Sequence, residues 1–537
     1  DACTTGTSNV GVGSECLGSA TTGSLNSGVG VSALSGLTTG SSNVAVGLQA
    51  MQLQTTGSNN TALGKDALRY FVASNNTAVG MDSLQGANGS STGTNNAALG
   101  YRSLQDNTTG QQNTALGADS MYTNTTGSTN VAVGFMTLYH NTTASDNTGC
   151  GYQALLSNTT GASNTALGRL SLYNNTTASN NTGIGVRALL SNTTGASNVA
   201  VGANALDENT TANDNTAVGT NALTSSTTAD QNVAVGTNSA DSITTASRCT
   251  AMGSQALAAC TTGNDNTAIG YQTADALTTG TSNVVIGNSA MGAGNTARDN
   301  TVVGRNAGTS MTSAFRNVII GYEAATSLTS TQENVCIGTD SADEMTTGRY
   351  NTCVGNNSAH NLTTGQHNVF VGHATVTAGG DEEKQIVIGT DITSQGSYRF
   401  TFGRDGDRVH NQFNSNASWT RNSDVRKKKD ILTNTDLGLD FINDLRTVTY
   451  KWKAPSELPE TISGYNKDET EPSHKDKMYG FIAQEVKASL DKYNITDFNG
   501  WSEDKNGEQG ISYEMFVMPL VKAVQELSAK VTALEAA

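Results

Sequence analysis

The 537-residue chain has few of the residues from which enzymes build a large core. Only 36% of its residues are hydrophobic, 5% are aromatic and 14% are charged, and it contains 4 Pro but 58 Gly. This composition argues against an ordinary enzyme with one large hydrophobic core. All Pro and all Trp lie after residue 418, so the composition changes there. We therefore expect two different kinds of structure in one chain.

Positive charge and long apolar runs are also missing. The formal net charge is −16 and the isoelectric point is near 4.8. Binding to nucleic acid needs a basic surface that meets the phosphates, so we predict no nucleic acid partner. No run of about 18 apolar residues is present, so we expect no insertion into a membrane. The seven Cys form no C-x-x-C pair and no metal-ligand spacing with the six His, so we predict no metal site, no cofactor and no disulfide framework.

A short repeat fills most of the chain. The motif Asn-Thr/Val-Ala-Val/Leu/Ile-Gly recurs between residues 9 and 389, in most cases every 17 residues, and Cys249 and Gln385 each replace its Asn once. Seventeen residues are too few for two helices and a turn, and β-branched residues followed by Gly disfavour helix. We predict a mostly β fold, a parallel β-solenoid or β-roll with one coil per repeat. At about 4.8 Å per coil, its 23 coils would form a rod on the order of 110 Å long.

Alternation along the motif assigns its side chains to two faces. In one representative motif, Asn198 and Ala200 point one way, and Val199 and Val201 point the other way. Neither face is charged, so we expect one to be covered by the coil interior and the other by neighbouring chains. Stacked Asn side chains would form a hydrogen-bonded ladder along the axis. We favour this structural role of the Asn over ligand binding.

Three smaller features also follow the repeat. Cys336 and Cys353 occupy the Ala position of consecutive coils, where we expect small buried side chains rather than a disulfide. The sequons at Asn158 and Asn192 would accept glycans in a eukaryotic secretory pathway, but turn residues copied with the repeat are the simpler interpretation. The Thr-Thr pair in each turn raises the alternative of an ice-binding solenoid, which is disfavoured because adjacent Thr side chains in a strand point in opposite directions.

The repeat motif resembles the repeats in the left-handed β-roll heads of trimeric autotransporter adhesins, and similar arrays in phage tail fibres. In those rolls, three chains pack together and hide their flanks. The resemblance covers residues 9 to about 389 and implies a homotrimer. A cellular trimeric surface adhesin is therefore an alternative to a viral fibre.

The rest of the chain has an ordinary globular composition. Residues 397–403 alternate like a strand, and residues 411–422 are polar and linker-like. Residues 437–445 have helical spacing, residues 447–452 are strand-like, and Gly480 begins a motif that opens another helix. The chain closes with an a/d seam formed by Val517, Leu520, Val524, Leu527, Val531 and Leu534. We predict a solenoid shaft at 1–389, a strand and linker at 390–422, and a small α+β domain at 423–537 that ends in a coiled-coil helix.

The junction before this last domain carries a basic run, which by default is a solvated surface. Its context suggests more. The junction, the later Gly480 motif and the terminal helix together resemble the intramolecular chaperone auto-processing domain that ends many phage tail spikes, tail fibres and endosialidases. The matching residues are Ser423, Asp424, Arg426, Lys428, Ile431, Gly480, Gln484 and Glu485.

The resemblance implies a domain that trimerises, assists folding of the upstream fibre and then cuts itself off. It implies cleavage between Ser423 and Asp424, with Ser423 as the nucleophile and Lys428 as the base. A Ser hydroxyl needs a base, and Lys can serve where burial or neighbouring positive charge, here Arg426 and Lys427, favours its neutral form. Such a serine peptidase acts once and in cis. We expect no activity on an external substrate, because paired carboxylates do not recur in the repeats.

Together these features predict a structural, receptor-binding fibre of a virus or phage. It would be a homotrimer that belongs to the virion, works outside the cell and meets a host-cell surface receptor, either glycan or protein. Near-identical repeats allow a strand to slip by a whole coil. A C-terminal trimer that forms first would fix the register of the three chains.

Overall fold

The computed structural model describes residues 4–87, 91–405, 407–414, 420–421, 425–460, 465–472, 475–504 and 507–537. The chain divides into two compact units, Asp1–Asn422 and Ser423–Ala537. We describe each unit by itself.

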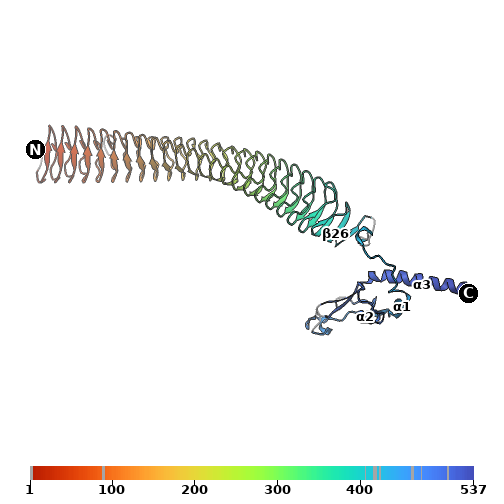
Figure 1. The fold of residues 1–537 in the computed structure, drawn as a ribbon. Coiled ribbons are helices and arrows are strands. Elements are labelled where there is room, and N and C mark those ends of the chain that lie inside the picture. Colours follow the sequence, from red (N-terminus) through yellow and green to blue (C-terminus); the bar gives the residue numbers. More distant parts are fainter. Residues whose placement is uncertain are drawn as a thin grey trace. The chain divides into compact units, whose positions relative to one another are not determined.

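Unit 1 is a parallel β-solenoid of about 23 turns, as predicted, with one short strand per coil (Figure 1). Consecutive strands pair in parallel, and each residue lies beside its equivalent in the next coil, as Ala200 does beside Ala217. The stacked strands are β1 (Val10–Val12), β2 (Ser27–Val29), β3 (Val44–Val46), β4 (Thr61–Leu63), β5 (Thr77–Val79), β6 (Ala97–Leu99), β7 (Thr114–Leu116), β8 (Val131–Val133), β9 (Thr148–Cys150), β10 (Thr165–Leu167), β11 (Thr182–Ile184), β12 (Val199–Val201), β13 (Thr216–Val218), β14 (Val233–Val235), β15 (Thr250–Met252), β16 (Thr267–Ile269), β17 (Val284–Ile286), β18 (Thr301–Val303), β19 (Val318–Ile320), β20 (Val335–Ile337), β21 (Thr352–Val354), β22 (Val369–Val371), β24 (Ile386–Thr390) and β26 (Arg399–Arg404).

The predicted Asn ladder is present inside the coils. Asn198 is buried, and its Oδ1 accepts the backbone N–H of Asn215 at 3.0 Å. Its Nδ2 donates to the carbonyl oxygen of Ala212 at 2.8 Å and, more weakly, to Asn181 Oδ1 at 3.3 Å. The ladder therefore ties each strand to the backbone of the next coil as well as to the neighbouring Asn. Buried amides are tolerated here because their donors and acceptors are satisfied.

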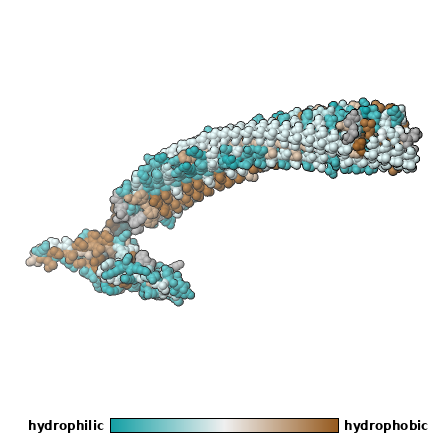
Figure 2. Space-filling view, turned by 180° about the vertical axis from the view of Figure 1, so that it is seen from behind, coloured by the Kyte–Doolittle hydropathy of each residue, from teal (hydrophilic) through white to brown (hydrophobic). Residues whose placement is uncertain are grey.

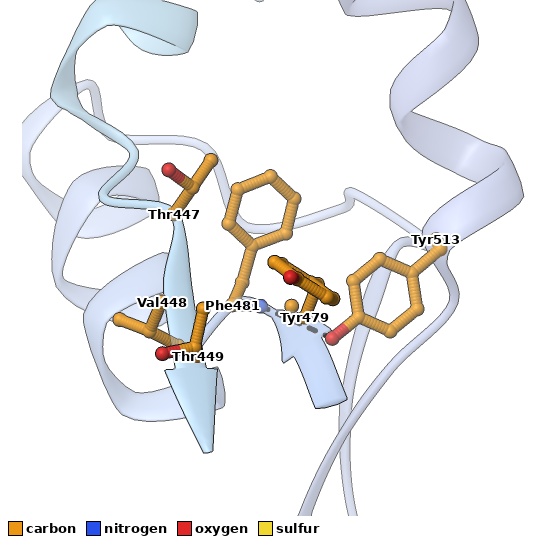
Figure 3. Close-up of a pocket in the computed structure, with 7 residues that line it drawn as sticks. Thr447, Val448, Thr449, Tyr479, Phe481 and Tyr513 are labelled. Carbon is orange, nitrogen blue, oxygen red and sulfur yellow. Dashed lines mark hydrogen bonds between the residues drawn. The ribbon is translucent and has the colours of Figure 1, made fainter. Parts of the chain in front are cut away.

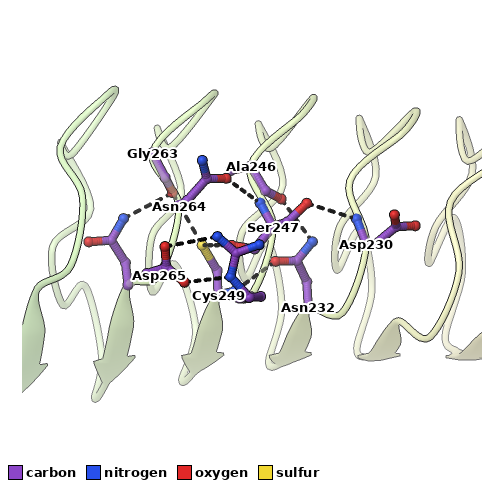
Figure 4. Close-up of polar contacts among 10 residues, drawn as sticks. Asp230, Asn232, Ala246, Ser247, Cys249, Gly263, Asn264 and Asp265 are labelled. Atoms are coloured by element: carbon purple, nitrogen blue, oxygen red, sulfur yellow. Dashed lines mark hydrogen bonds and ion pairs between the residues drawn. The ribbon is translucent and has the colours of Figure 1, made fainter.

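Cys249 replaces one Asn of this ladder, and its thiol takes over part of the amide's role. Its backbone N–H donates to Asn232 Oδ1 at 2.8 Å, and its Sγ donates to the carbonyl oxygen of Gly263 at 3.2 Å (Figure 4). The carbonyl oxygen of Gly263 stands where the other coils present their acceptor to the Asn amide. Cys336 and Cys353 lie in register on adjacent strands, buried and not joined by a disulfide, as predicted.

A second buried Asn ladder, which the sequence analysis missed, runs through the Asn-Thr-Thr turns from Asn107 to Asn209. Asn158 Nδ2 donates to Asn141 Oδ1 and to the carbonyl oxygen of Gly161, both at 2.9 Å. The sequon amides at Asn158 and its equivalent in each neighbouring coil are thus inside the solenoid, and a glycan cannot be attached to them in the folded shaft. From Ile243 onward most side chains in this column are apolar.

Each coil turns sharply after its strand. Gly202 has a φ of 139°, and a Cβ on it would lie 2.4 Å from the carbonyl oxygen of Gly219. This close approach explains the Gly that ends each motif. Two residues farther on, Asn204 and then Leu206 have φ values of 56° and 52°, and Leu206 donates its backbone N–H to the carbonyl oxygen of Ala222 at 3.0 Å. The second segment of each coil is therefore a hydrogen-bonded turn rather than a strand.

The second strand face is open in this single chain. Ala200 is buried, whereas Val199 and Val201 are half-buried, and Val44 and Leu99 are 43% and 48% exposed at equivalent positions. This confirms the predicted alternation. The space-filling view shows hydrophobic residues gathered in a band along one side of the C-terminal half of the shaft (Figure 2). The predicted cover by neighbouring chains stays a prediction.

The parallel sheet continues beyond residue 389, where we expected the shaft to end. Phe400 and Phe402 of β26 pair with Ile386 and Ile388 of β24, since the alternation of residues 399–404 repeats the motif after a shorter step. Within 390–422, part of the expected linker is also strand: β27 (Asp407–Gln412) pairs antiparallel with β26, and β28 (Thr420–Arg421) pairs antiparallel with β27. This reversal ends the parallel stack. A small parallel pair, β23 (Thr375–Val376) and β25 (Ile392–Thr393), lies in the last coils.

Unit 2 combines short helices with two antiparallel strand pairs, β29 with β30 and β31 with β32. Its core is formed by Leu437, Phe441, Val486, Leu490 and Phe516. The elements are η1 (Val425–Lys427), α1 (Leu439–Asp444), β29 (Val448–Tyr450), η2 (Pro455–Glu457), β30 (Met478–Gly480), α2 (Ala483–Lys492), β31 (Trp501–Glu503), β32 (Gln509–Ile511), η3 (Tyr513–Phe516) and α3 (Val517–Glu535).

Candidate functional site

The predicted processing residues lie at the start of unit 2. Ser423 and Asp424 lie outside the described residues. The chain then forms the single 3-10 turn η1, in which the backbone N–H of Lys428 donates to the carbonyl oxygen of Val425 at 3.1 Å. The side chains of Arg426 and Lys428 are exposed. Lys428, the predicted base, therefore lies on a short turned segment. It follows the predicted nucleophile by five residues in the sequence, and the geometry of the dyad stays a prediction.

Ile431 follows the basic run on the same segment. It is 62% exposed, and Leu432 beside it is 87% exposed. Asp430 has a φ of 52°, which turns the chain between the basic run and these apolar residues. Exposed aliphatic side chains next to a proposed cleavage site are available to pack against another surface.

Gly480 lies at the end of β30, where a larger residue does not fit. A Cβ at this position would lie 2.1 Å from the hydroxyl oxygen of Tyr513. That hydroxyl accepts the backbone N–H of Phe481 at 3.1 Å, and the rings of Phe481 and Tyr513 stack with their centres 5.8 Å apart. Gly480 thus allows the start of η3 to close against the strand pair β29 and β30.

Two apolar clefts flank this contact. A cleft of about 510 Å³ is lined by residues of β29 and β30 together with Phe481 and Tyr513 (Figure 3). A second cleft of about 450 Å³ shares Phe481 and Tyr513 and includes Trp452 and Gln484. Tyr479 and Trp452 are 74% and 51% exposed. Gln484, one of the motif residues named from the sequence, therefore lies beside exposed aromatic side chains.

Glu485 lies in the first turn of α2 and joins this helix to the end of α1. Arg446 Nε donates to Glu485 Oε2 at 3.1 Å, and the guanidinium makes a second bond to the other carboxylate oxygen. The hydrogen bond from Arg446 lowers the pKa of Glu485 below its usual value. The pair is exposed, so solvent screens its contribution to stability. A carboxylate at this helix N-terminus is also favoured by the helix dipole.

The C-terminal helix α3 has one face on the core and one face open. Pro519 and Ala523 are buried, and Glu526 accepts the backbone N–H of Leu439 at 2.8 Å. A Cβ on Gly438 would collide with this carboxylate. On the open face the predicted seam is 44% to 78% exposed along Val517, Leu520, Val524, Leu527, Val531 and Leu534. The seam is thus available for packing outside its own chain.

Residues 423–495 match the family model described as the chaperone of endosialidase. The match supports an intramolecular chaperone domain at the C-terminus, of a family whose domains cleave themselves. It includes every predicted site residue and ends before α3. No curated protein and no solved structure matches the chain.

Among the residues that the structure describes, His, Cys, Asp and Glu nowhere gather in groups of three or more that could hold an ion. Within the same described ranges, no helix has both the length and the apolar character needed to cross a membrane.

Two residues of unit 2, Tyr513 and Glu526, were not predicted from the sequence. The hydroxyl of Tyr513 explains why residue 480 is Gly, and the carboxylate of Glu526 explains Gly438. Tyr513 and Glu526 lie 32 and 87 residues from their hydrogen-bond partners, Phe481 and Leu439. A single Tyr or Glu carries no local pattern. The available signal was the two Gly residues beside apolar segments, because Gly at such places marks a close approach of another group.

Proposed function

We propose that this chain is a structural, receptor-binding fibre of a virus or phage. Its C-terminal domain drives homotrimerisation and folding of the shaft and is then released by cleavage between Ser423 and Asp424. The observation that carries this proposal is a coincidence of boundaries: the family match begins at residue 423, and the compact units divide between Asn422 and Ser423. A folding tool that is removed must be separable from its product at the cut.

The open seam of α3 supports association of several chains. A 19-residue helix with an exposed apolar stripe gains stability by packing that stripe against copies of itself. Val at the a positions and Leu at the d positions are also typical of two-stranded coils. The number three therefore rests on the resemblances of the repeats and of the C-terminal domain to trimeric proteins, and light scattering of the full chain tests it directly.

Host recognition belongs to the same proposal. The long stack of coils supplies a surface that a host-cell glycan or protein could bind, and the proposed place of action is the virion surface, outside the cell. The low charge of the shaft and its repeated polar turns fit a durable fibre better than an enzyme that acts on other molecules.

Ser423→Ala tests the cleavage. We expect the unaltered chain to yield two fragments whose intact masses place the cut after Ser423, because a Ser nucleophile and a Lys base act together. Ser423→Ala and Lys428→Ala should each give one uncut chain, with cleavage reduced at least about 100-fold.

Lys429→Ala is the matched control, since it removes one positive charge from the same run but leaves the predicted base. It should cleave nearly as fast as the unaltered protein. A Ser423→Ala chain that still separates into the same two fragments on a denaturing gel would rule out the assignment.

A further inference from the structure

The outward face of the solenoid carries an unbroken apolar column. We define the outer column as the third residue of every strand from β1 to β22 together with Ile388 of β24. It consists of Val, Leu, Ile and Met, with Cys150 in β9 as the one exception. None of its members is buried, and exposed members occur along its whole length: Val12 is 58% exposed, Leu167 is 48% exposed and Ile388 is 42% exposed, while others such as Val201 are half-buried.

The neighbouring column on the same face is also uncharged. The first residue of each of these strands is Thr or Val in nearly every coil, with Ser27, Ala97 and Ile386 as the variants. The charges of the shaft lie on the turns instead, as in the ion pair between Arg248 and Asp265. The strand face is therefore the surface of the coils from which charge is absent.

The size of this face is that of a protein interface. Burial free energies imply roughly 60–120 Å² of apolar surface per aliphatic side chain, so the partly exposed outer column presents on the order of 1,000 Å². A specific interface needs about 800 Å² per partner. Monomeric proteins rarely leave contiguous apolar patches larger than a few hundred Å² in water.

The period of the column identifies its occupant. A partner that covers it must present apolar groups at the same coil spacing over the same length, and a second copy of this chain does so by construction. In a cyclic assembly with its axis along the shaft, each residue lies beside the same residue of the other copies. A charged residue on this face would then lie beside the same charge in the other copies and be repelled. The absence of charged residues from the strand face is therefore what such packing requires.

We propose that the outer column is the surface through which copies of this chain pack, in parallel and in register, in the shaft. The inference rests on the proposed homotrimer and names the face that forms it. Each outer-column residue meets its equivalent in the neighbouring copies near the common axis.

Cys150 provides a natural probe of this packing. It is half-buried in the outer column, and Cys16 near the N-terminus is also half-buried, whereas Cys249, Cys260, Cys336 and Cys353 are buried in the core. A short bismaleimide added to the full chain that carries Cys3→Ser and Cys16→Ser should join Cys150 of two copies and give a dimer band on a denaturing gel. Cys150→Ser should remove that band.

Glu208→Cys in the Cys150→Ser background is the matched control. Glu208 is exposed and lies midway along the coil between β12 and β13, so its copies should not be joined. The assembled mass is measured by light scattering before cross-linking. A trimer that is joined through position 208 but not through position 150 overturns the proposed face and leaves the trimer standing. A monomeric mass overturns both.

A charge test gives a second readout. Val201→Asp with Val218→Asp adds like charges to the outer column, and we expect the assembled mass to fall from three chains towards one. Thr211→Asp with Thr228→Asp adds the same charges at exposed turn positions of the same coils and should keep the trimer. If both double variants lose the trimer to the same extent, the proposal is contradicted.

Discussion

At the residue scale, the shaft is stabilised by buried amides rather than by large hydrophobic side chains. The inner positions hold Ala, Asn and Leu, so each coil is thin and has little volume to fill. An amide in such an interior is favourable only if its N–H donors and its carbonyl oxygen find hydrogen-bond partners. Stacking identical coils meets this condition, because every Asn finds the same partner one coil away.

Asn158→Leu tests the second ladder. The substitution removes the donor to Asn141 Oδ1 and the acceptor for Asn175 Nδ2, so buried polar atoms lose their partners. We expect a loss of about 1–3 kcal/mol in local stability, measured as faster backbone hydrogen exchange in the flanking coils.

Asn209→Leu is the control for that change. Asn209 is also buried and ends the ladder, and its Oδ1 has no hydrogen-bond partner among the described residues. Replacing Asn209 leaves fewer buried polar groups without a partner, so we expect a clearly smaller loss of local stability than for Asn158→Leu. If both variants exchange equally fast, the ladder is not what stabilises these coils.

The sequence predicts the first ladder but not the second, for a physical reason. Asn198 stands in a strand whose alternation shows which way it points. Asn158 stands in an Asn-Thr-Thr turn, where the same residues also form surface loops. Its burial depends on the φ of Leu155, which is 53°, and a positive φ at Leu has no signature in the sequence.

At the element scale, the stability of unit 2 depends on contacts between its helices, of which α1 and α2 are short. Helix α1 has six residues and no side-chain cap of its own. Glu526 of α3 supplies the cap by accepting the backbone N–H of Leu439 at 2.8 Å. That hydrogen bond lowers the pKa of Glu526 below its usual value. The link therefore couples the terminal helix to the segment that follows the proposed processing site.

Glu526→Gln tests this cap through its pH dependence. Because the folded-state pKa is lowered, the charged cap stabilises the unit above the unfolded pKa of about 4.3, and the stabilisation is lost as the pH falls through the folded value. We expect the variant to melt at a lower temperature at pH 7. Once the pH lies below this lowered folded-state pKa, the two proteins should melt alike, since protonated Glu and Gln are both neutral.

Glu535→Gln serves as the control for the loss of one carboxylate. It changes an exposed residue in the last turn of the same helix and should not reproduce the pH-dependent difference. Melting is followed by circular dichroism in the full chain. If Glu526→Gln still melts at a lower temperature than the unaltered protein at low pH, the loss of stability comes from the changed side-chain shape and not from the lost charge.

Elements were predictable where the pattern is local. The 17-residue period predicts the stack of strands, and the heptad spacing predicts α3. The Gly480 motif was predicted to open a helix, and α2 does begin within it at Ala483, but the first residue of the motif, Gly480, ends strand β30. The strand forms because Val448 pairs with Gly480 across a long loop, and such distant pairing leaves no local trace. The aromatic clefts beside Phe481 could not be predicted for the same reason, because their lining residues come from segments that are far apart in the sequence.

At the scale of the whole molecule, the regularity that makes the shaft stable also makes its assembly ambiguous. If three chains pack through the outer column, a slip of one coil still places aliphatic side chains against aliphatic side chains. The loss is one coil out of about 23, so the slipped states are close in free energy to the correct one. The irregular steps between Asn60, Asn76 and Asn96 and the single Cys150 are among the few features that mark a position along the column.

A domain that associates first at one end removes this ambiguity, and a chain that ends at Ser423 tests the idea. We expect this shaft alone to give a mixture of masses and a Cys150 cross-linking yield several-fold below that of the full chain, because a slip of one coil places Cys150 beside Val133 or Leu167 of another copy. Ser423→Ala is the control: it keeps the chaperone attached and should cross-link fully. A released shaft should also keep its register after cleavage, because chains that are already packed separate slowly. If the truncated shaft matches the full chain in both mass and cross-linking, the C-terminal unit is not needed to set the register.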